Sequence, residues 1–157
     1  MPTIELTTFI RSDIYVCFDL SRSIDLHVLS TTQTKEKAIA GRTNGLINLN
    51  EFVTWEAIHF GIKQQLTSKI TEYNRPFYFR DEQQKGAFNS FLHNHYFEKK
   101  NDLVVMMDAL HYTSPFGLAG KIFNALILTG YLKKLLVKRN QLIKEFAESG
   151  EWKKILS

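Results

Sequence analysis

The chain of 157 residues has a single cysteine, Cys17, so no disulfide can form within it. That usage is typical of proteins in a reducing compartment. No apolar run approaches the roughly 20 residues that a membrane-spanning helix needs. The first residues show no basic segment followed by an apolar stretch, as a signal peptide would. We therefore expect a cytoplasmic protein without an integral membrane segment.

Glycine-rich loops and strong net charge are also missing. Gly41, Gly45, Gly61 and Gly86 lie at predicted turn or bulge positions, and none belongs to a phosphate-loop pattern. The formal net charge is only +4, and many of the lysines fall on the polar face of a predicted helix. A nucleic-acid-binding surface would be indicated by a basic stripe interleaved with exposed aromatic residues. We expect no nucleic-acid partner.

Aromatic residues, in contrast, are abundant at 13% of the chain, with twelve phenylalanines. Such an excess suits either a bulky core or an apolar pocket. The hydrophobic content of 44% and the charged content of 23% are ordinary for a globular protein. The length indicates one domain with a real core. We predict a single domain over residues 1–150 and a short, frayed tail over residues 151–157.

The last quarter of the chain predicts one long amphipathic helix over residues 116–149. Ser114 is a good N-cap, and Pro115 suits the first helical position. Apolar residues then recur at helical spacing between Phe123 and Phe146. At about 1.5 Å per residue the helix would be a rod of roughly 50 Å. Such a rod needs a wide apolar surface to lie on.

The chain before this helix predicts an antiparallel sheet. Alternating residues over 3–10 indicate a first strand, which two short helices over residues 13–19 and 22–29 follow. The strands predicted after them cover residues 37–40, 51–60, 63–73, 76–83, 86–98 and 103–113. Short links between long alternating strands indicate antiparallel hairpins. The order predicts an α+β fold in which a curved antiparallel sheet wraps around the C-terminal helix.

Pairing across the hairpins predicts which strand face looks inward. A two-residue turn at residues 61–62 would pair Ala57 with Leu66, so that these apolar side chains face inward together with Trp55 and His59. The same logic in the next hairpin pairs residue 68 with residue 81 and residue 70 with residue 79. One face of the sheet is therefore expected to combine apolar side chains with a few polar groups.

The last hairpin predicts a specific polar contact. A turn at residues 100–101 would place His93 opposite Asp108 and His95 opposite Met106. Opposed residues have Cβ atoms about 4.5–5.5 Å apart, which is near enough for an imidazole–carboxylate hydrogen bond. We expect the carboxylate to outweigh burial and to raise the pKa of His93.

Several local strings carry a family resemblance. They are Ser-Ile-Asp-Leu-His (23–27), Val-Thr-Trp-Glu-Ala-Ile-His-Phe-Gly (53–61), Gly-Ala-Phe-Asn-Ser-Phe-Leu-His-Asn-His-Tyr-Phe (86–97) and Ser-Pro-Phe-Gly (114–117). With the order of elements, they resemble stand-alone bacterial SRPBCC proteins of the START/birch-pollen-allergen helix-grip superfamily, often labelled polyketide cyclase/dehydrase-like. The resemblance covers essentially the whole chain. It implies a helix-grip fold with a deep cavity between sheet and helix, and it supplies no universal catalytic residues.

The inward face yields the predicted site residues. The expected ligand-binding set is Trp55, His59, Phe79, Asp81, Phe91, His93, His95, Phe97, Met106, Asp108 and Tyr112. His93, Asp108 and His59 are the catalytic candidates, because a carboxylate beside an imidazole sets its tautomer and basicity. A purely structural polar network is the alternative. The two strand histidines with His59 would also suit zinc, but no further motif supports this, so we expect no metal and no cofactor.

Three functions remain open at this stage. The favoured one is binding of a lipid-, polyketide- or aromatic-like small molecule in the cavity, which the resemblance implies. The alternatives are a cyclase/dehydratase-type enzyme and a co-chaperone-like protein-interaction module. An enzyme should have polar groups that converge at one place in the cavity, whereas a carrier should have them scattered or at the mouth. An interaction module should have a filled cavity and an exposed apolar patch.

Overall fold

The computed structural model describes residues 2–114 and 117–156, apart from the side chains of residues 120, 124 and 125. Its elements, in chain order, are β1 (Thr3–Ile10), α1 (Ile14–Ser21), α2 (Ile24–Ser30), the short 3-10 helix η1 (Thr32–Thr34), β2 (Lys37–Gly41), β3 (Phe52–His59), β4 (Ile62–Asn74), β5 (Tyr78–Lys85), β6 (Ser90–Lys100), β7 (Leu103–Thr113), α3 (Gly117–Phe123), the π-helix η2 (Asn124–Leu128), α4 (Thr129–Ser149) and α5 (Trp152–Leu156).

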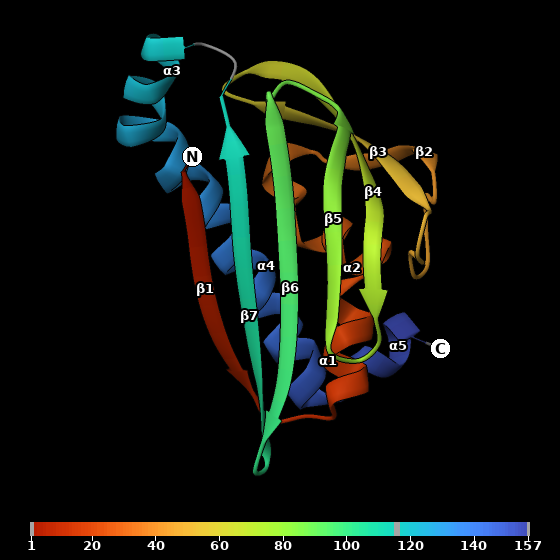
Figure 1. Cartoon of the computed structure of the whole chain (residues 1–157). Coiled ribbons are helices and arrows are strands. Elements are labelled where there is room, and N and C mark those ends of the chain that lie inside the picture. The colour runs from red at the N-terminus through yellow and green to blue at the C-terminus, as the bar shows by residue number, and fades with distance from the viewer. Residues whose placement is uncertain (1, 115–116, 157) are drawn as a thin grey trace.

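The strands form one antiparallel sheet in the order β1-β7-β6-β5-β4-β3-β2. Every neighbouring pair except β1 and β7 is joined directly in sequence, as the short predicted links require. Figure 1 shows the sheet curving in front of α1, α2 and α4, with α4 running along its length. The predicted α+β architecture, a curved antiparallel sheet around a long C-terminal helix, is confirmed.

The two short helices begin at side-chain caps. The Asp13 carboxylate accepts hydrogen bonds from the backbone N–H groups of Tyr15 and Val16 at the start of α1. The Ser23 hydroxyl accepts from the N–H of Leu26 at the start of α2. Both caps satisfy donors that a helix leaves unpaired in its first turn. These helices pack against α4 behind the sheet.

The C-terminal helix differs from the predicted rod. The π-helical η2 interrupts it, so α3 and α4 are separate α-helical segments. Pro115 and Phe116, predicted at its start, lie outside the described residues. Gly150 adopts φ 84° and ends α4 in the left-handed conformation that glycine favours.

The expectation of a frayed tail is wrong. Residues 152–156 form α5, and the side chains of Trp152, Ile155 and Leu156 pack against the main apolar core. The apolar residues of this segment therefore cover part of the core, which outweighs the tendency of a chain end to fray. The division into a domain over residues 1–150 and a tail stays a prediction.

The strand registers also differ from prediction, always without changing the inward face. The β3–β4 turn is Phe60-Gly61, so Trp55 and not Ala57 lies opposite Leu66. Phe60 and Gly61 have φ 53° and 75°, as a tight hairpin turn requires at both central positions. This is a slip of two residues, and because strand side chains alternate with period two, it leaves each side chain on its predicted side.

The next two hairpins show the same kind of difference. In β4–β5, Ile70 and not Ser68 lies opposite Asp81, and the register shifts between Ile70 and Glu72. In β6–β7, Lys100 pairs with Leu103, so His95 and not His93 lies directly opposite Asp108. The predicted direct opposition of His93 and Asp108 is therefore wrong, although both face the same side of the sheet.

Apolar side chains gather in two core clusters between the sheet and the helices. The larger one centres on Phe18 of α1, Phe79, Phe97 and Ile143 of α4. The smaller one contains Leu110, Tyr112 and Leu136 with their neighbours. Residues from both clusters border one cavity, so the core is not filled continuously between sheet and helix.

Candidate functional site

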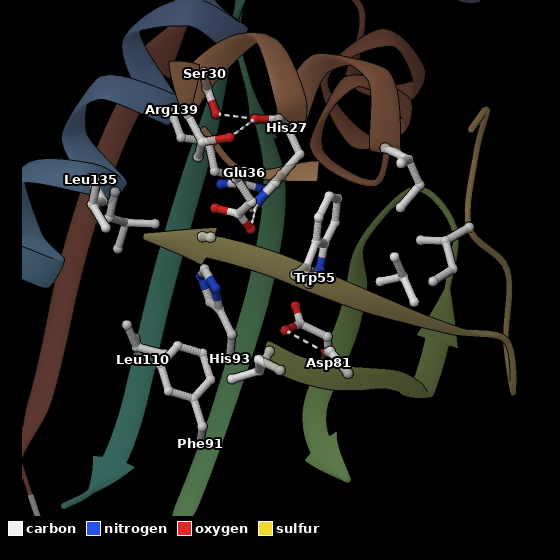
Figure 2. Close-up of a pocket in the computed structure, with 18 of the residues that line it drawn as sticks. His27, Ser30, Glu36, Trp55, Asp81, Phe91, His93, Leu110, Leu135 and Arg139 are labelled. Carbon is white, nitrogen blue, oxygen red and sulfur yellow. Dashed lines mark hydrogen bonds and ion pairs between the residues drawn. The ribbon is translucent and has the colours of Figure 1, made fainter. Parts of the chain in front are cut away.

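A cavity of about 230 Å³ lies between the sheet and α4. Strands β3 to β7 contribute its sheet side, while α2, α4 and the segment before β2 contribute the opposite side. Figure 2 shows its apolar wall at Leu110, Leu135 and Phe91, with Trp55 on the other side of the space. Polar side chains interrupt this wall at two separate places.

The structure brings many of the predicted residues to the cavity and buries the others outside it. The predicted residues that line the cavity are Trp55, His59, Phe79, Asp81, Phe91, His93 and His95. Those that are buried but do not line it are Phe97, Met106, Asp108 and Tyr112. The latter residues point to the same side of the sheet, but other side chains separate them from the open space, which the alternation of strand side chains alone does not reveal.

The first polar group centres on Asp108, whose side chain is fully buried. One carboxylate oxygen accepts a 2.8 Å hydrogen bond from Nε2 of His93. The other accepts a 2.7 Å bond from the side-chain amide of Asn140 in α4. The Arg139 guanidinium lies 3.6 Å from the same carboxylate. The expected His93–Asp108 contact therefore exists, reached diagonally across the strands rather than between opposed residues.

Asp81 extends this group to the next strand. Its carboxylate is bonded to Nε2 of His95 at 2.6 Å and accepts a bond from the Ser68 hydroxyl at 3.3 Å. The rings of His93 and His95 stack with their centroids 3.7 Å apart. The two carboxylates and two imidazoles thus form one continuous cluster, and its histidines face the cavity.

The charges of this cluster follow from burial and hydrogen bonding. Burial raises the pKa of Asp81, but the bond from His95 and nearby positive charge lower it more, to about 2. Burial likewise opposes ionisation of Asp108, but the hydrogen bond from His93, the nearby His95 imidazole and the charge of Arg139 hold its pKa well below the usual value. Both carboxylates are therefore ionised at neutral pH.

The expectation for His93 is wrong in sign. Burial lowers the pKa of His93 and the neighbouring His95 lowers it further, which together outweigh the Asp108 carboxylate. His93 is consequently neutral at neutral pH. The prediction weighed one carboxylate against burial and did not include a second imidazole stacked on the first.

The same cluster has the composition of a metal site. Asp81, His93 and His95 each offer a ligand atom, and these atoms lie within 4.8 Å of one another. His59, the third ligand considered from sequence, is instead bonded to Tyr131. A metal would have to compete with two direct hydrogen bonds, since Nε2 of His95 is bonded to Asp81 and Nε2 of His93 to Asp108. The geometry favours a hydrogen-bonded cluster.

A second polar group comes from α2 and the segment before β2, and its carboxylate, Glu36, was not predicted from the sequence. Nε2 of His27 is bonded to the Glu36 carboxylate at 2.8 Å, and the His27 ring lies 4.2 Å from that of Trp55. Burial raises the pKa of Glu36, but the charges of His27 and His59 and the His27 bond lower it more, so Glu36 is ionised. Glu36 follows a polar loop with no motif, and its only sequence signal is its charge.

His59 stands at the end of β3 beside this second group. Its Nδ1 is bonded to the Tyr131 hydroxyl of α4 at 2.6 Å, and the Phe60 ring lies 4.6 Å from that of Tyr131. Burial lowers the pKa of His59, and the nearby Glu36 carboxylate offsets only part of this effect. Burial raises the pKa of Tyr131. This contact joins the β3–β4 hairpin to the C-terminal helix.

Solved structures of other proteins share this architecture. StfQ, described as a di-domain ARO/CYC from the steffimycin biosynthetic pathway, matches with a TM-score of 0.75 at 12% identity, over 95% of this chain and 51% of StfQ. Major latex-like protein 151 from Panax ginseng matches with 0.67 at 16% identity, over 93% of this chain and 97% of that one. TTHA0849 from Thermus thermophilus matches with 0.71 at 12% identity, over 90% and 97%.

No protein-family model matches the chain, and no curated protein matches its sequence. Likeness at these identities shows the fold alone, because one fold carries many functions. The helix-grip fold expected from the sequence is therefore confirmed. In the part of the chain that is described, no helix is long and apolar enough to span a membrane.

Proposed function

We propose that this helix-grip chain binds a hydrophobic or amphipathic small molecule, of lipid-, polyketide- or aromatic-like chemistry, in the cavity between its sheet and α4. One observation carries the proposal: a cavity of about 230 Å³ with a mostly apolar surface interrupts the core, and polar side chains are placed along its wall. Binding pockets typically combine an apolar lining with a small number of placed polar groups.

The size of the cavity limits the ligand. Its 230 Å³ lies below the range of about 300–1,000 Å³ that is usual for pockets of drug-sized ligands. The ligand is accordingly small, or one part of a larger molecule enters. StfQ and the ginseng protein are described as an ARO/CYC and a major latex-like protein, and because these descriptions differ, the shared fold does not favour one reaction.

A bulky side chain inside the cavity tests the proposal. Ala57 is buried and lines the cavity, so Ala57→Phe places a ring in the ligand space. We expect this variant to bind 1-decanol at least about tenfold more weakly than the wild type in calorimetric titration, because the apolar contact area is lost. Ala40→Phe, the same change at an exposed position of β2, should leave the affinity unchanged. Equal affinities in all three proteins would contradict binding in this cavity.

Acid–base catalysis is a second candidate, and one observation favours it. His93 faces the cavity, is neutral, and is oriented through Nε2 by the Asp108 carboxylate. An imidazole held in this way can accept a proton through its other nitrogen. Native mass spectrometry separates the two functions, since an enzyme would release a molecule of altered composition and a carrier would release what it took up.

The third alternative, a protein-interaction module, also has a structural feature in its favour. The large apolar side chains of Leu118, Ile122, Leu126 and Ile127 on α3 and η2 are exposed. The cavity is open, however, and an interaction module was expected to have it filled. We therefore prefer small-molecule binding to a protein-interaction role.

The proposed cytoplasmic location and bacterial type rest on the sequence resemblance and on Cys17. Burial and the nearby Asp13 carboxylate raise the pKa of the Cys17 thiol to about 12, and its side chain is fully buried. The thiol therefore stays protonated and unreactive. Such a cysteine acts as a small core residue.

A further inference from the structure

The charged groups at the cavity surface differ in how far they are already bonded within the protein. The carboxylates of Glu36 and Asp81 and the guanidinium groups of Arg22 and Arg139 all line the space. A charged group can bind the polar end of an amphipathic molecule only if its hydrogen bonds and its charge are not already used within the protein.

Both arginines already have internal carboxylate partners. Arg22 donates through Nε to the Asp19 carboxylate at 2.8 Å and through Nη1 to the backbone carbonyl of Ile47 and the side chain of Asn48. An acidic ligand that paired with this guanidinium would have to compete with the Asp19 carboxylate. Buried ion pairs resist this because the displaced charge would be left without a partner.

Arg139 is equally committed. Its guanidinium donates to the Asn140 side-chain oxygen at 2.9 Å and to the Ser21 carbonyl and hydroxyl at 2.9 and 2.8 Å. It also lies 3.6 Å from Asp108. These bonds join α4 to α1, so the group has a structural role. Among the described lysines and arginines that line the cavity, each positive charge already has a carboxylate nearby, Asp19 for Arg22 and Asp108 for Arg139.

Glu36 differs from all these groups. Its Oε1 takes the bond from His27, whereas the described residues supply no hydrogen bond to Oε2. The side chain is only 11% exposed, and it lines the cavity. Figure 2 shows the carboxylate in the space between Trp55 and Leu135. An ionised, mostly buried carboxylate oxygen without a donor favours a ligand that supplies one.

We propose that Glu36 receives the polar end of the ligand, and that this end is a hydrogen-bond donor with positive charge: the cavity selects an amphipathic amine over an alcohol and excludes a carboxylate. This inference rests on the proposed small-molecule binding and adds the chemistry of the head group. The apolar part of the molecule lies against the wall that contains Leu110, Leu135 and Phe91. Asp81, also ionised, adds to the negative potential that repels an acid.

Three probes with the same ten-carbon chain test the head group directly. Decylamine, 1-decanol and decanoate are titrated into the wild-type protein at pH 7 by calorimetry. We expect decylamine to bind about tenfold more tightly than 1-decanol, because its ammonium adds the attraction of opposite charges to the hydrogen bond with the Glu36 carboxylate. Decanoate should bind more weakly than either, because its charge has the same sign as that of Glu36. Decanoate binding as tightly as decylamine overturns the inference and leaves the proposed function intact. Failure of all three probes to bind overturns both.

Variants of Glu36 connect the selectivity to this residue. Glu36→Gln keeps the size of the side chain and removes its charge. Decylamine and 1-decanol should then bind with about equal affinity, while the affinity for 1-decanol changes little from the wild type. Glu36→Asp keeps the charge and should retain a preference. Glu72→Gln removes a solvent-facing carboxylate and is the matched control. A preference that persists in Glu36→Gln overturns the assignment of Glu36. The order of the three probe affinities is measured on the wild-type protein, so it tests the head-group preference even if a variant does not fold.

Discussion

At the scale of single residues, Asp108 is a buried, ionised carboxylate that depends on its hydrogen-bond and ion-pair partners. It is fully buried, ionised, and bonded to His93 of β6 and Asn140 of α4, with Arg139 close by. Each of these groups would be costly to bury without a partner. Asp108 was predicted as a ligand contact, but its position behind the cavity wall makes it the residue that orients His93 and joins the sheet to the helix.

Removing this charge should therefore destabilise the fold strongly. Asp108→Asn retains the shape but leaves the Arg139 charge and the His93 donor with a poorer acceptor. We expect the free energy of unfolding in urea to fall by about 3–5 kcal/mol, as for other broken buried ion pairs. Asp102→Asn is the control, since Asp102 is exposed and its bridge to Arg11 is solvated. A loss in Asp108→Asn no larger than in the control would mean that the cluster contributes no stability.

At the scale of elements, α4 serves as the wall of the cavity and as part of the core. Leu132, Leu135 and Leu136 border the open space, whereas Ile143, two turns later, is completely buried in the main core cluster. The end of the helix toward η2 thus contacts the ligand space, and the end toward Gly150 holds the helix in place. The interruption at η2 separates this anchored segment from α3.

Substitutions along α4 should reflect this division. Ile143→Ala removes a side chain from a closely packed position, so we expect it to reduce the free energy of unfolding by about 2–5 kcal/mol. Val137→Ala, at a position that is 37% exposed, should have a much smaller effect. Urea denaturation of both variants measures the difference. Similar losses would show that the helix is not anchored through Ile143.

At the scale of the whole molecule, the buried titrating groups link stability to pH. Burial lowers the pKa of His93 and of His59 below their unfolded value of about 6.5. Below that value the unfolded chain binds protons that the folded chain does not, so stability decreases as the pH falls. Asp81 and Asp108 have lowered pKa values, and their contribution is present above about 3.9 and is lost as the pH falls toward the folded values.

The free energy of unfolding should accordingly fall in two steps on acidification. The first step begins below about pH 6.5 as the unfolded histidines take up protons, and the second begins below about pH 3.9 as the carboxylates do. Urea denaturation between pH 8 and pH 3 measures both. The variant His59→Gln should reduce the first step and preserve the second, because His59 contacts neither Asp81 nor Asp108. A wild-type stability that rises between pH 7.5 and pH 5.5 would contradict the neutral state of His93 and His59.

Local sequence patterns determined the elements and the inward faces. Alternation placed Trp55, Phe79 and His93 on the inner side of the sheet, and period-two geometry made this result insensitive to register slips of two residues. The helix pattern located the C-terminal helix, because its apolar stripe is a property of neighbouring residues. These features need no knowledge of distant contacts.

Only the tertiary structure decided which inward residues reach the cavity and how they are charged. Tyr112 and Met106 share the inner face with His93, yet packing encloses them in the core. Glu36 enters the site because β2 pairs with β3 and α2 packs its His27 ring on Trp55, and its position in an irregular segment leaves no periodic signal. Burial, together with the charge of the neighbouring His95, reversed the expected pKa shift of His93. Each outcome depends on burial and on several side chains that are close in space but distant in sequence. The local pattern of residues does not specify these contacts.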